Sequence, residues 1–203
     1  MTRNNYSATI TEEKIQNQCT NVTYPQVGGL KNSAVEAQIN ELIKRTVFNL
    51  IPPEGCEEYQ EIFGTYEVKL NEKGILSINI NMYTFRIMAA NGLDVQKSIN
   101  VDLETGKVYQ LYELFKPGSD YRIVLSRMIE KQIEERQLPM IREFTGITDY
   151  QDYYLTDDSL VIYFQEITYF PHYAGIQEFP IPYRQIRNLV RPGSPIARLL
   201  QDP

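Results

Sequence analysis

The sequence has few of the residues on which common catalytic centres depend. Its 203 residues include one histidine, two cysteines and no tryptophan. A zinc hydrolase usually holds its metal with two or three imidazoles, so the single histidine, His172, excludes that chemistry. Cys19 and Cys56 lie far apart and form no C-x-x-C pair, which leaves no zinc knuckle and no thioredoxin-type site. We therefore expect neither a metal site nor a cofactor.

Sequence motifs of catalysis are also missing. The chain has no G-x-S-x-G, no G-x-G-x-x-G and no G-x-x-x-x-G-K-[ST], so neither an activated serine nor a nucleotide site is indicated. Three aspartates, Asp152, Asp157 and Asp158, flank a hairpin but lack the spacing of a calcium loop, and we interpret them as turn residues. No catalytic residue is predicted. Many glycosidases use two carboxylates that come together only in the folded protein and therefore show no fixed spacing in the sequence. Such a glycosidase stays open as an alternative.

Charge and hydropathy limit the partners. There are 20 Lys and Arg against 26 Asp and Glu, a net charge of −6, and no segregated basic patch, so nucleic acid is not an expected partner. The longest apolar runs, such as "GILSINI", are far shorter than a membrane-spanning helix. The first residues, "MTRNNYSATI", lack the apolar region of a signal peptide. The chain is nevertheless compatible with the excised part of an exported or anchored precursor.

The two cysteines leave two alternatives open. They are either buried thiols or one disulfide, and their sequence separation does not decide between these. If the protein is exported, a bridge from Cys19 to Cys56 would join an early strand to the segment after the first helix.

Two amphipathic helices are predicted. The first covers about residues 33–50, begins with a capping box at Ser33 and ends before two prolines. Its apolar stripe consists of Val35, Ile39, Leu42, Ile43, Thr46 and Leu50. The second covers about residues 119–137 and carries Tyr121, Leu125, Met128, Ile129 and Ile133 on one face, opposite a charged face.

Strands account for most of the remaining chain. "YSATI" and "QCTNVTYPQV" indicate two early strands, and period-two alternation predicts an antiparallel meander with one wet face over residues 65–70, 76–82 and 99–103. "YYLTDDSLVIYF" predicts a hairpin, and a last strand lies near "QEFPIPY". The fold class is therefore α+β, with a mostly antiparallel sheet packed against the two helices. We expect one domain over residues 1–190, with halves at about 6–97 and 98–190, and a loose tail over 191–203.

The most unusual stretch is "YFQEITYFPHYAGIQEFPIPY", residues 163–183, which is crowded with aromatic rings. We interpret it chiefly as a structural corner with exposed neighbours. Tyrosine is a frequent anchor of recognition surfaces, and loops often carry binding residues. Four residues are predicted to contact a partner: Tyr169, Phe170, His172 and Tyr173. The absence of tryptophan favours a protein over a sugar as that partner, without excluding a sugar.

Three segments, in order, resemble a known bacterial family. They are "VTYPQVGGL", "INVDLETGKVYQLYELFKPGSDY" and "YYLTDDSLVIYFQEITYFPHYAGIQEFPIPYRQI". Together they resemble the paired extracytoplasmic domains of the RsiV/PdaC-like family, found in anti-sigma factors and in peptidoglycan deacetylases. The resemblance covers about residues 6–190. It implies an α+β fold, a place outside the bacterial membrane and, as in the anti-sigma branch, a receptor for lysozyme.

The resemblance does not carry a whole function to this chain. The segment given has no sigma-binding part, no transmembrane helix and no deacetylase domain with metal-binding histidines. We therefore expect a non-catalytic module of the bacterial cell envelope that binds a protein, such as a lysozyme-like one, or a cell-wall glycan. The alternative is a carboxylate-dependent hydrolase that acts on cell-wall glycan.

Overall fold

The computed structural model describes residues 6–201 and divides into two compact units, of which the first ends at Lys107 and the second begins at Val108. Each unit has its own sheet, and both sheets are mostly antiparallel, which confirms the predicted α+β class. The expectation of one domain over residues 1–190 stays a prediction, which a single melting transition would test. Within the described residues, no helix has the length and apolarity needed to cross a membrane.

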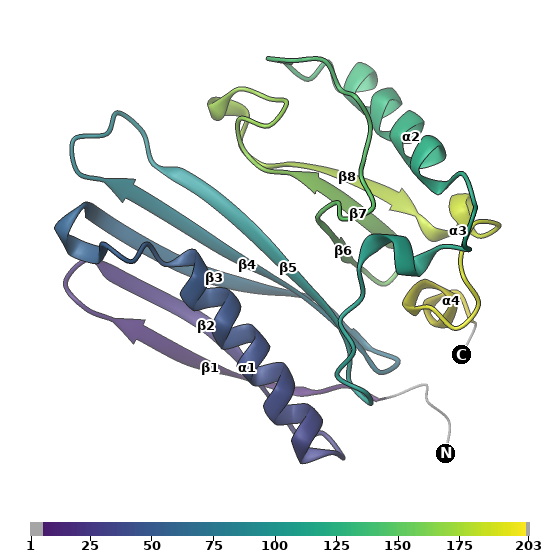
Figure 1. The fold of residues 1–203 in the computed structure, drawn as a ribbon, viewed down its shortest axis with the longest axis horizontal. Helices are drawn as coiled ribbons and strands as arrows, with labels where there is room; N and C mark the ends of the chain where they lie inside the picture. Colours follow the sequence, from purple (N-terminus) through teal and green to yellow (C-terminus); the bar gives the residue numbers. More distant parts are fainter. Residues whose placement is uncertain (1–5, 202–203) are drawn as a thin grey trace. The chain divides into compact units, whose positions relative to one another are not determined.

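The sheet of the first unit has five strands in chain order: β1 (Thr9–Gln16), β2 (Thr20–Gly28), β3 (Tyr59–Glu72), β4 (Ile75–Arg86) and β5 (Leu93–Asp102) (Figure 1). All neighbours are antiparallel except β2 and β3, which pair in parallel through three residues of each strand. This parallel pair follows from the helix between them, because a crossover returns the chain to the same end of the sheet. β3, β4 and β5 form the predicted meander.

The helix α1 (Ser33–Leu50) has the predicted bounds and packs on one face of this sheet (Figure 1). Its buried residues are Val35, Ile39, Ile43 and Val47, while Leu42 is only half-buried. The N-cap is also one residue earlier than predicted. The Asn32 side chain accepts hydrogen bonds from the backbone N–H groups of the first turn, and an amide oxygen caps a helix as well as a hydroxyl does.

The polar residues of β4 are not on a wet face, contrary to the sequence prediction. Ser77 and Asn79 are fully buried. Ser77 Oγ lies 2.7 Å from Asn100 Oδ1, and Ser98 Oγ lies 2.6 Å from Asn79 Oδ1. These hydrogen bonds run between β4 and β5 and pair Ser77 and the Asn79 oxygen across the two strands, as buried polar groups generally require, whereas the buried Asn79 Nδ2 has no hydrogen-bond partner among the described residues.

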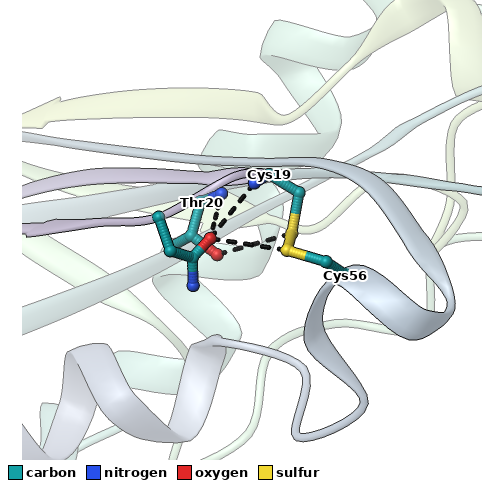
Figure 2. Close-up of a disulfide and its surroundings, with 4 residues drawn as sticks. Cys19, Thr20 and Cys56 are labelled. Atoms are coloured by element: carbon teal, nitrogen blue, oxygen red, sulfur yellow. Dashed lines mark hydrogen bonds between the residues drawn. A yellow bond between two sulfur atoms is a disulfide. The ribbon is translucent and has the colours of Figure 1, made fainter.

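A disulfide joins Cys19 to Cys56, which settles the alternative that the sequence left open. Cys19 lies in the turn between β1 and β2, and Cys56 lies in the short helix η2 (Gly55–Glu57) that precedes β3 (Figure 2). Asn17 organises this turn, since its Oδ1 accepts hydrogen bonds from the backbone N–H groups of Cys19 and Thr20. The bridge therefore ties η2 to the tip of the first hairpin.

The second unit contains a three-stranded antiparallel sheet made of β6 (Tyr153–Leu155), β7 (Ser159–Phe164) and β8 (Gln177–Pro182). The first two strands are the predicted hairpin. The helix α2 (Tyr121–Glu135) is slightly shorter than predicted and buries Tyr121, Leu125 and Ile129. Its side chain Gln132 donates a hydrogen bond to the Pro180 carbonyl, which fixes α2 against β8. Two short helices precede and follow this core: η3 (Leu111–Leu114) and α3 (Tyr183–Ile186).

The end of the described chain differs from the predicted loose tail. Residues 195–199 form the helix α4 (Pro195–Leu199), in which Pro195, Ile196 and Leu199 are buried. Ser194 caps this helix through its hydroxyl, which accepts a hydrogen bond from the Ala197 N–H. The prediction failed because three apolar side chains in a run rich in proline and glycine were too few to indicate a helical period.

Candidate functional site

The aromatic stretch forms the connection between β7 and β8, over residues 165–176. Its backbone cannot continue either strand, because Ile167 and Gly175 both have positive φ angles, of 62° and 67°. Positive φ is unfavourable for a β-branched residue, so the surrounding contacts must hold Ile167 in place. Within this connection, residues 172–174 form the short helix η4 (His172–Ala174). The predicted structural corner is thus a compact loop.

Phe170 is the internal anchor of this loop. The sequence analysis predicted that it contacts a partner, and its position in the structure corrects this. Its side chain is completely buried, with its ring centroid 6.0 Å from that of Phe179 on β8. A side chain without exposed surface cannot contact a partner. The residue type alone did not reveal this, because an aromatic ring serves equally well as a core residue and as a surface anchor.

Tyr169 lies at the boundary between core and surface. Its ring makes edge-to-face contacts with Phe144 and Phe164, at centroid distances of 5.3 and 5.1 Å. Its hydroxyl lies 3.3 Å from the hydroxyl of Thr145 and is part of an exposed hydrogen bond. The ring therefore supports the loop, and its polar tip is accessible.

The segment after α2, residues 138–145, packs along this loop. The Ile141 N–H donates to the Tyr169 carbonyl at 2.8 Å, and Arg142 Nη2 donates to the Ile167 carbonyl at 3.3 Å. Three apolar side chains of the two segments remain accessible: Met140, Ile141 and Ile167, exposed to 37%, 47% and 48%. Beside them lies an open cavity of about 480 Å³, lined by Glu130, Ile133, Glu134, Met140, Ile141, Arg142, Glu143 and Phe144.

His172 is paired with Glu166 in the same loop. Its Nδ1 lies 2.7 Å from Glu166 Oε2, and the carboxylate is buried to all but 4% while the imidazole is 36% exposed. In the part of the chain that the structure describes, no hydroxyl or thiol is hydrogen-bonded to this imidazole. The ring therefore holds a buried carboxylate at the base of the loop and has no nucleophile beside it.

Tyr173 is the most exposed of the four predicted residues, with 81% of its surface accessible. It lies in the middle of η4, between Pro171, whose ring fixes its own φ, and Gly175, whose positive φ ends the turn. A stiff aromatic side chain on a constrained turn loses little entropy when it is bound. Of the predicted residues, it is best placed to contact a partner.

We call the accessible residues of the two segments the loop surface. They comprise Met140, Ile141, Ile167, Tyr169, His172 and Tyr173. Sequence analysis found only the last three, because Met140 and Ile141 follow α2 in a run with no periodic pattern. A signal was present in "LPMIREF", where two large apolar residues follow a helix-ending proline without belonging to any predicted element.

Negative charge lies next to the loop surface. Glu130 and Glu134 on α2 and Glu143 after it all line the cavity, with Arg142 as the one positive side chain of its lining. Among the described residues, no group of three or more histidine, cysteine, aspartate or glutamate side chains has the geometry to hold a metal ion. Chemically, the site offers apolar contact area, phenol hydroxyls and a carboxylate rim.

Comparison with known proteins finds a family that matches the second unit and a relative that matches most of the chain. Residues 112–184 match the model of a family described as "Protein of unknown function (DUF3298)", so the match falls within the second unit and includes α2 and the loop. The chain is 28% identical over 199 residues to the anti-sigma-V factor RsiV of Bacillus subtilis, with 89% of this chain and 68% of RsiV covered.

Two solved structures share the fold. A DUF3298 family member from Bacteroides fragilis superposes with a TM-score of 0.72 at 14% identity, covering 98% of this chain and all of that one. A DUF3298 family protein from Pseudomonas aeruginosa gives a TM-score of 0.66 at 16% identity, covering 97% and 96% of the two chains. The resemblance stated from the sequence is confirmed: the chain contains a DUF3298 domain and is a distant homologue of the anti-sigma factor RsiV.

Proposed function

We propose that this protein is a non-catalytic binding module of the bacterial cell envelope, which binds a cationic protein of the lysozyme type through the loop surface. The observation that carries the proposal is the exposed Tyr173 in the same loop as the accessible Ile167 and Tyr169, along which the accessible Met140 and Ile141 also pack. Monomeric proteins rarely expose contiguous apolar area unless it serves an interaction. Tyr173, Ile167 and Ile141 are all about half accessible or more.

Charge indicates the kind of partner. The chain carries a net charge of −6, and three glutamates line the cavity next to the loop surface. A partner with a positive surface would be attracted over a distance comparable to the Debye length, which is about 8 Å at physiological salt. Lysozyme-type proteins meet this requirement, and the resemblance to the anti-sigma branch of the family supports the same choice.

The disulfide supports a place outside the cytoplasm. A bridge between Cys19 and Cys56 is stable in oxidising compartments and rare in a reducing cytosol. Homology to an anti-sigma factor agrees with this, because the resemblance concerns the extracytoplasmic part of such proteins.

The alternative, a carboxylate-dependent hydrolase, would have to act at the cavity beside α2, which Glu130, Glu134 and Glu143 line. Such enzymes place two carboxyl groups about 5 to 10 Å apart in a cleft that binds the sugar. Here the glutamates share the lining with the apolar side chains of Ile133, Met140 and Ile141. The relative RsiV is an anti-sigma factor, which is a regulator and not a hydrolase. We therefore favour binding.

The experiment measures both activities on the same preparation. The chain is immobilised and titrated with a purified lysozyme-type protein at low and high salt, and it is incubated separately with purified cell wall. We expect saturable binding that weakens as salt rises, and no released sugar. Release of reducing sugar that disappears in Glu134→Gln would overturn the proposal in favour of the hydrolase.

A further inference from the structure

A second groove lies in the first unit, at the end of the sheet that carries the disulfide. It has a volume of about 740 Å³ and is lined by residues 16–21, 60–63, 83 and 85, which belong to the first hairpin, to β3 and to β4. None of these residues belongs to the loop surface, which lies in the other unit. The groove is therefore independent of the proposed function.

The floor of the groove is a row of side chains that runs from β1 to β4. Strand register places Gln16 opposite Asn21, Asn21 opposite Phe63, and Phe63 opposite Tyr83. Residues that are opposite each other in a sheet point to the same face. This is the face away from α1, because the alternate residues, such as Val22 and Ile62, are buried in the core. The row therefore presents amides and aromatic rings side by side.

The Tyr83 ring is fixed in its position by a glycine. A Cβ atom at Gly92 would lie 2.2 to 2.3 Å from two ring carbons and the hydroxyl oxygen of Tyr83, so the phenol lies directly on the Gly92 backbone. Phe63, which is 42% exposed, is the neighbour of Tyr83 across the strands, and Phe85 is half-buried two residues further along β4. Two aromatic residues thus occupy opposite positions of neighbouring strands on the same face of the sheet.

The amide side chains of the groove are available to a ligand. In the described part of the chain, the side chains of Gln16, Gln18, Asn21 and Gln60 make no hydrogen bond. Each carboxamide offers both donors and an acceptor. Their combination with aromatic faces suits a ligand that has hydroxyl groups around its edge and an apolar face.

The charge of the lining restricts the ligand further. Of the twelve lining residues, all among those that the structure describes, Glu61 is the only charged one, so the groove contains no cation for a phosphate, a carboxylate or a nucleic acid. A fatty chain would leave the amides without partners. We infer that this groove binds a neutral oligosaccharide, with Phe63 and Tyr83 stacked on pyranose rings and the four amides hydrogen-bonded to hydroxyl or acetamido groups.

The test is calorimetric titration of the full chain with two neutral probes, an oligomer of N-acetylglucosamine and an oligomer of glucose. An acidic polysaccharide is titrated in parallel. We expect saturable binding of at least one neutral probe and no binding of the acidic one. Phe63→Ala and Tyr83→Ala should each weaken that binding about tenfold or more.

Two further variants separate stacking from general damage. Gly92→Ala keeps every aromatic residue but displaces the Tyr83 ring, and it should weaken binding as Tyr83→Ala does. Phe48→Ala removes an aromatic ring of similar exposure, 50%, from α1 and should leave binding unchanged. Thermal unfolding of each variant shows that it is folded.

Three results would overturn the inference. The first is that neither neutral probe shows saturable binding. The second is that Phe48→Ala weakens binding as much as Phe63→Ala and Tyr83→Ala do. The third is that the acidic probe binds more tightly than the neutral ones. Binding of a lysozyme-type protein is measured separately, so a failure here leaves the proposed function untouched.

Discussion

Cys19 and Cys56 have their Cα atoms 5.5 Å apart and are joined by a disulfide across 37 positions of sequence. The loop that they close contains β2, α1 and the crossover to β3. Cross-linking a loop of this length lowers the entropy of the unfolded chain. In the loop-closure treatment this stabilises the folded state by about 4 kcal/mol.

We predict that the double variant Cys19→Ala with Cys56→Ala lowers the free energy of unfolding by about 2 to 4 kcal/mol. Urea denaturation measures this. Reductant should destabilise the wild type by a similar amount and leave the double variant unaffected. A wild type whose midpoint does not change with reductant would show that the bridge contributes nothing.

The buried stripe of α1 yields a second prediction. Ile43 has no exposed surface and Leu42 is only half-buried, although both belonged to the stripe predicted from sequence. Ile43→Asp should prevent folding of the first unit, because an unpaired buried charge costs several kcal/mol against a total stability of about 5 to 15. Leu42→Asp should cost clearly less. Circular dichroism during thermal unfolding compares the two, and equal losses would contradict the assigned helix face.

Gly64 on β3 provides a test of packing without any change of charge. A Cβ atom there would lie 2.6 Å from a methyl group of Val22 and 3.1 Å from the Met82 methyl. Gly64→Ala should therefore destabilise the first unit by about 1 to 3 kcal/mol through overpacking. Gly28→Ala is the matched control, since its nearest neighbour is a backbone atom at 4.0 Å, and it should be close to neutral.

Alkaline pH should destabilise the second unit through Tyr153. Burial raises the pKa of this phenol well above its usual value, and the charge of Glu113 raises it further. A folded-state pKa above that of the unfolded chain means that the stabilisation is complete below about pH 10 and is lost as pH rises beyond it.

Tyr153→Phe separates this effect from the hydrogen bond that the phenol donates to the Tyr109 carbonyl at 2.7 Å. The variant should be less stable than wild type at pH 8, by about 1 kcal/mol, and should lose less stability between pH 9 and pH 11. Urea midpoints at these three pH values measure both effects. An identical pH dependence of variant and wild type would show that Tyr153 is not the responsible group.

The periodic parts of the fold were predictable from sequence, and the parts that depend on distant contacts were not. The bounds of α1 and the hairpin of β6 and β7 followed from apolar spacing and turn residues. β1 was found only at its start, because residues 11–16 form an edge strand that is polar and exposed except at Ile15. The helix α4 and the buried polar pairs of β4 and β5 depend on neighbours that no local pattern identifies.

The loop surface was also predictable only in part, because the exposure of its residues depends on distant contacts. The aromatic loop was predicted as a partner site, but Phe170 is core while Met140, Ile141 and Ile167 are accessible. Exposure of an apolar residue is decided by what packs over it, which for Ile141 is a loop 26 to 28 positions later in the sequence. The Glu166 and His172 pair was also invisible to motif analysis, since neither residue belongs to a recognised spacing.

The central claim is that the loop surface binds a protein partner, and comparison of two tyrosines tests it most directly. Tyr173 in η4 and Tyr150 elsewhere in the same unit are exposed to 81% and 73%, so Tyr173→Ala and Tyr150→Ala remove equivalent surface area at different places. The measurement is the dissociation constant of each variant and of the wild type for one lysozyme-type protein. We predict that Tyr173→Ala weakens binding by about 1 to 3 kcal/mol and that Tyr150→Ala does not change it. Equal affinities of both variants and the wild type would contradict the account.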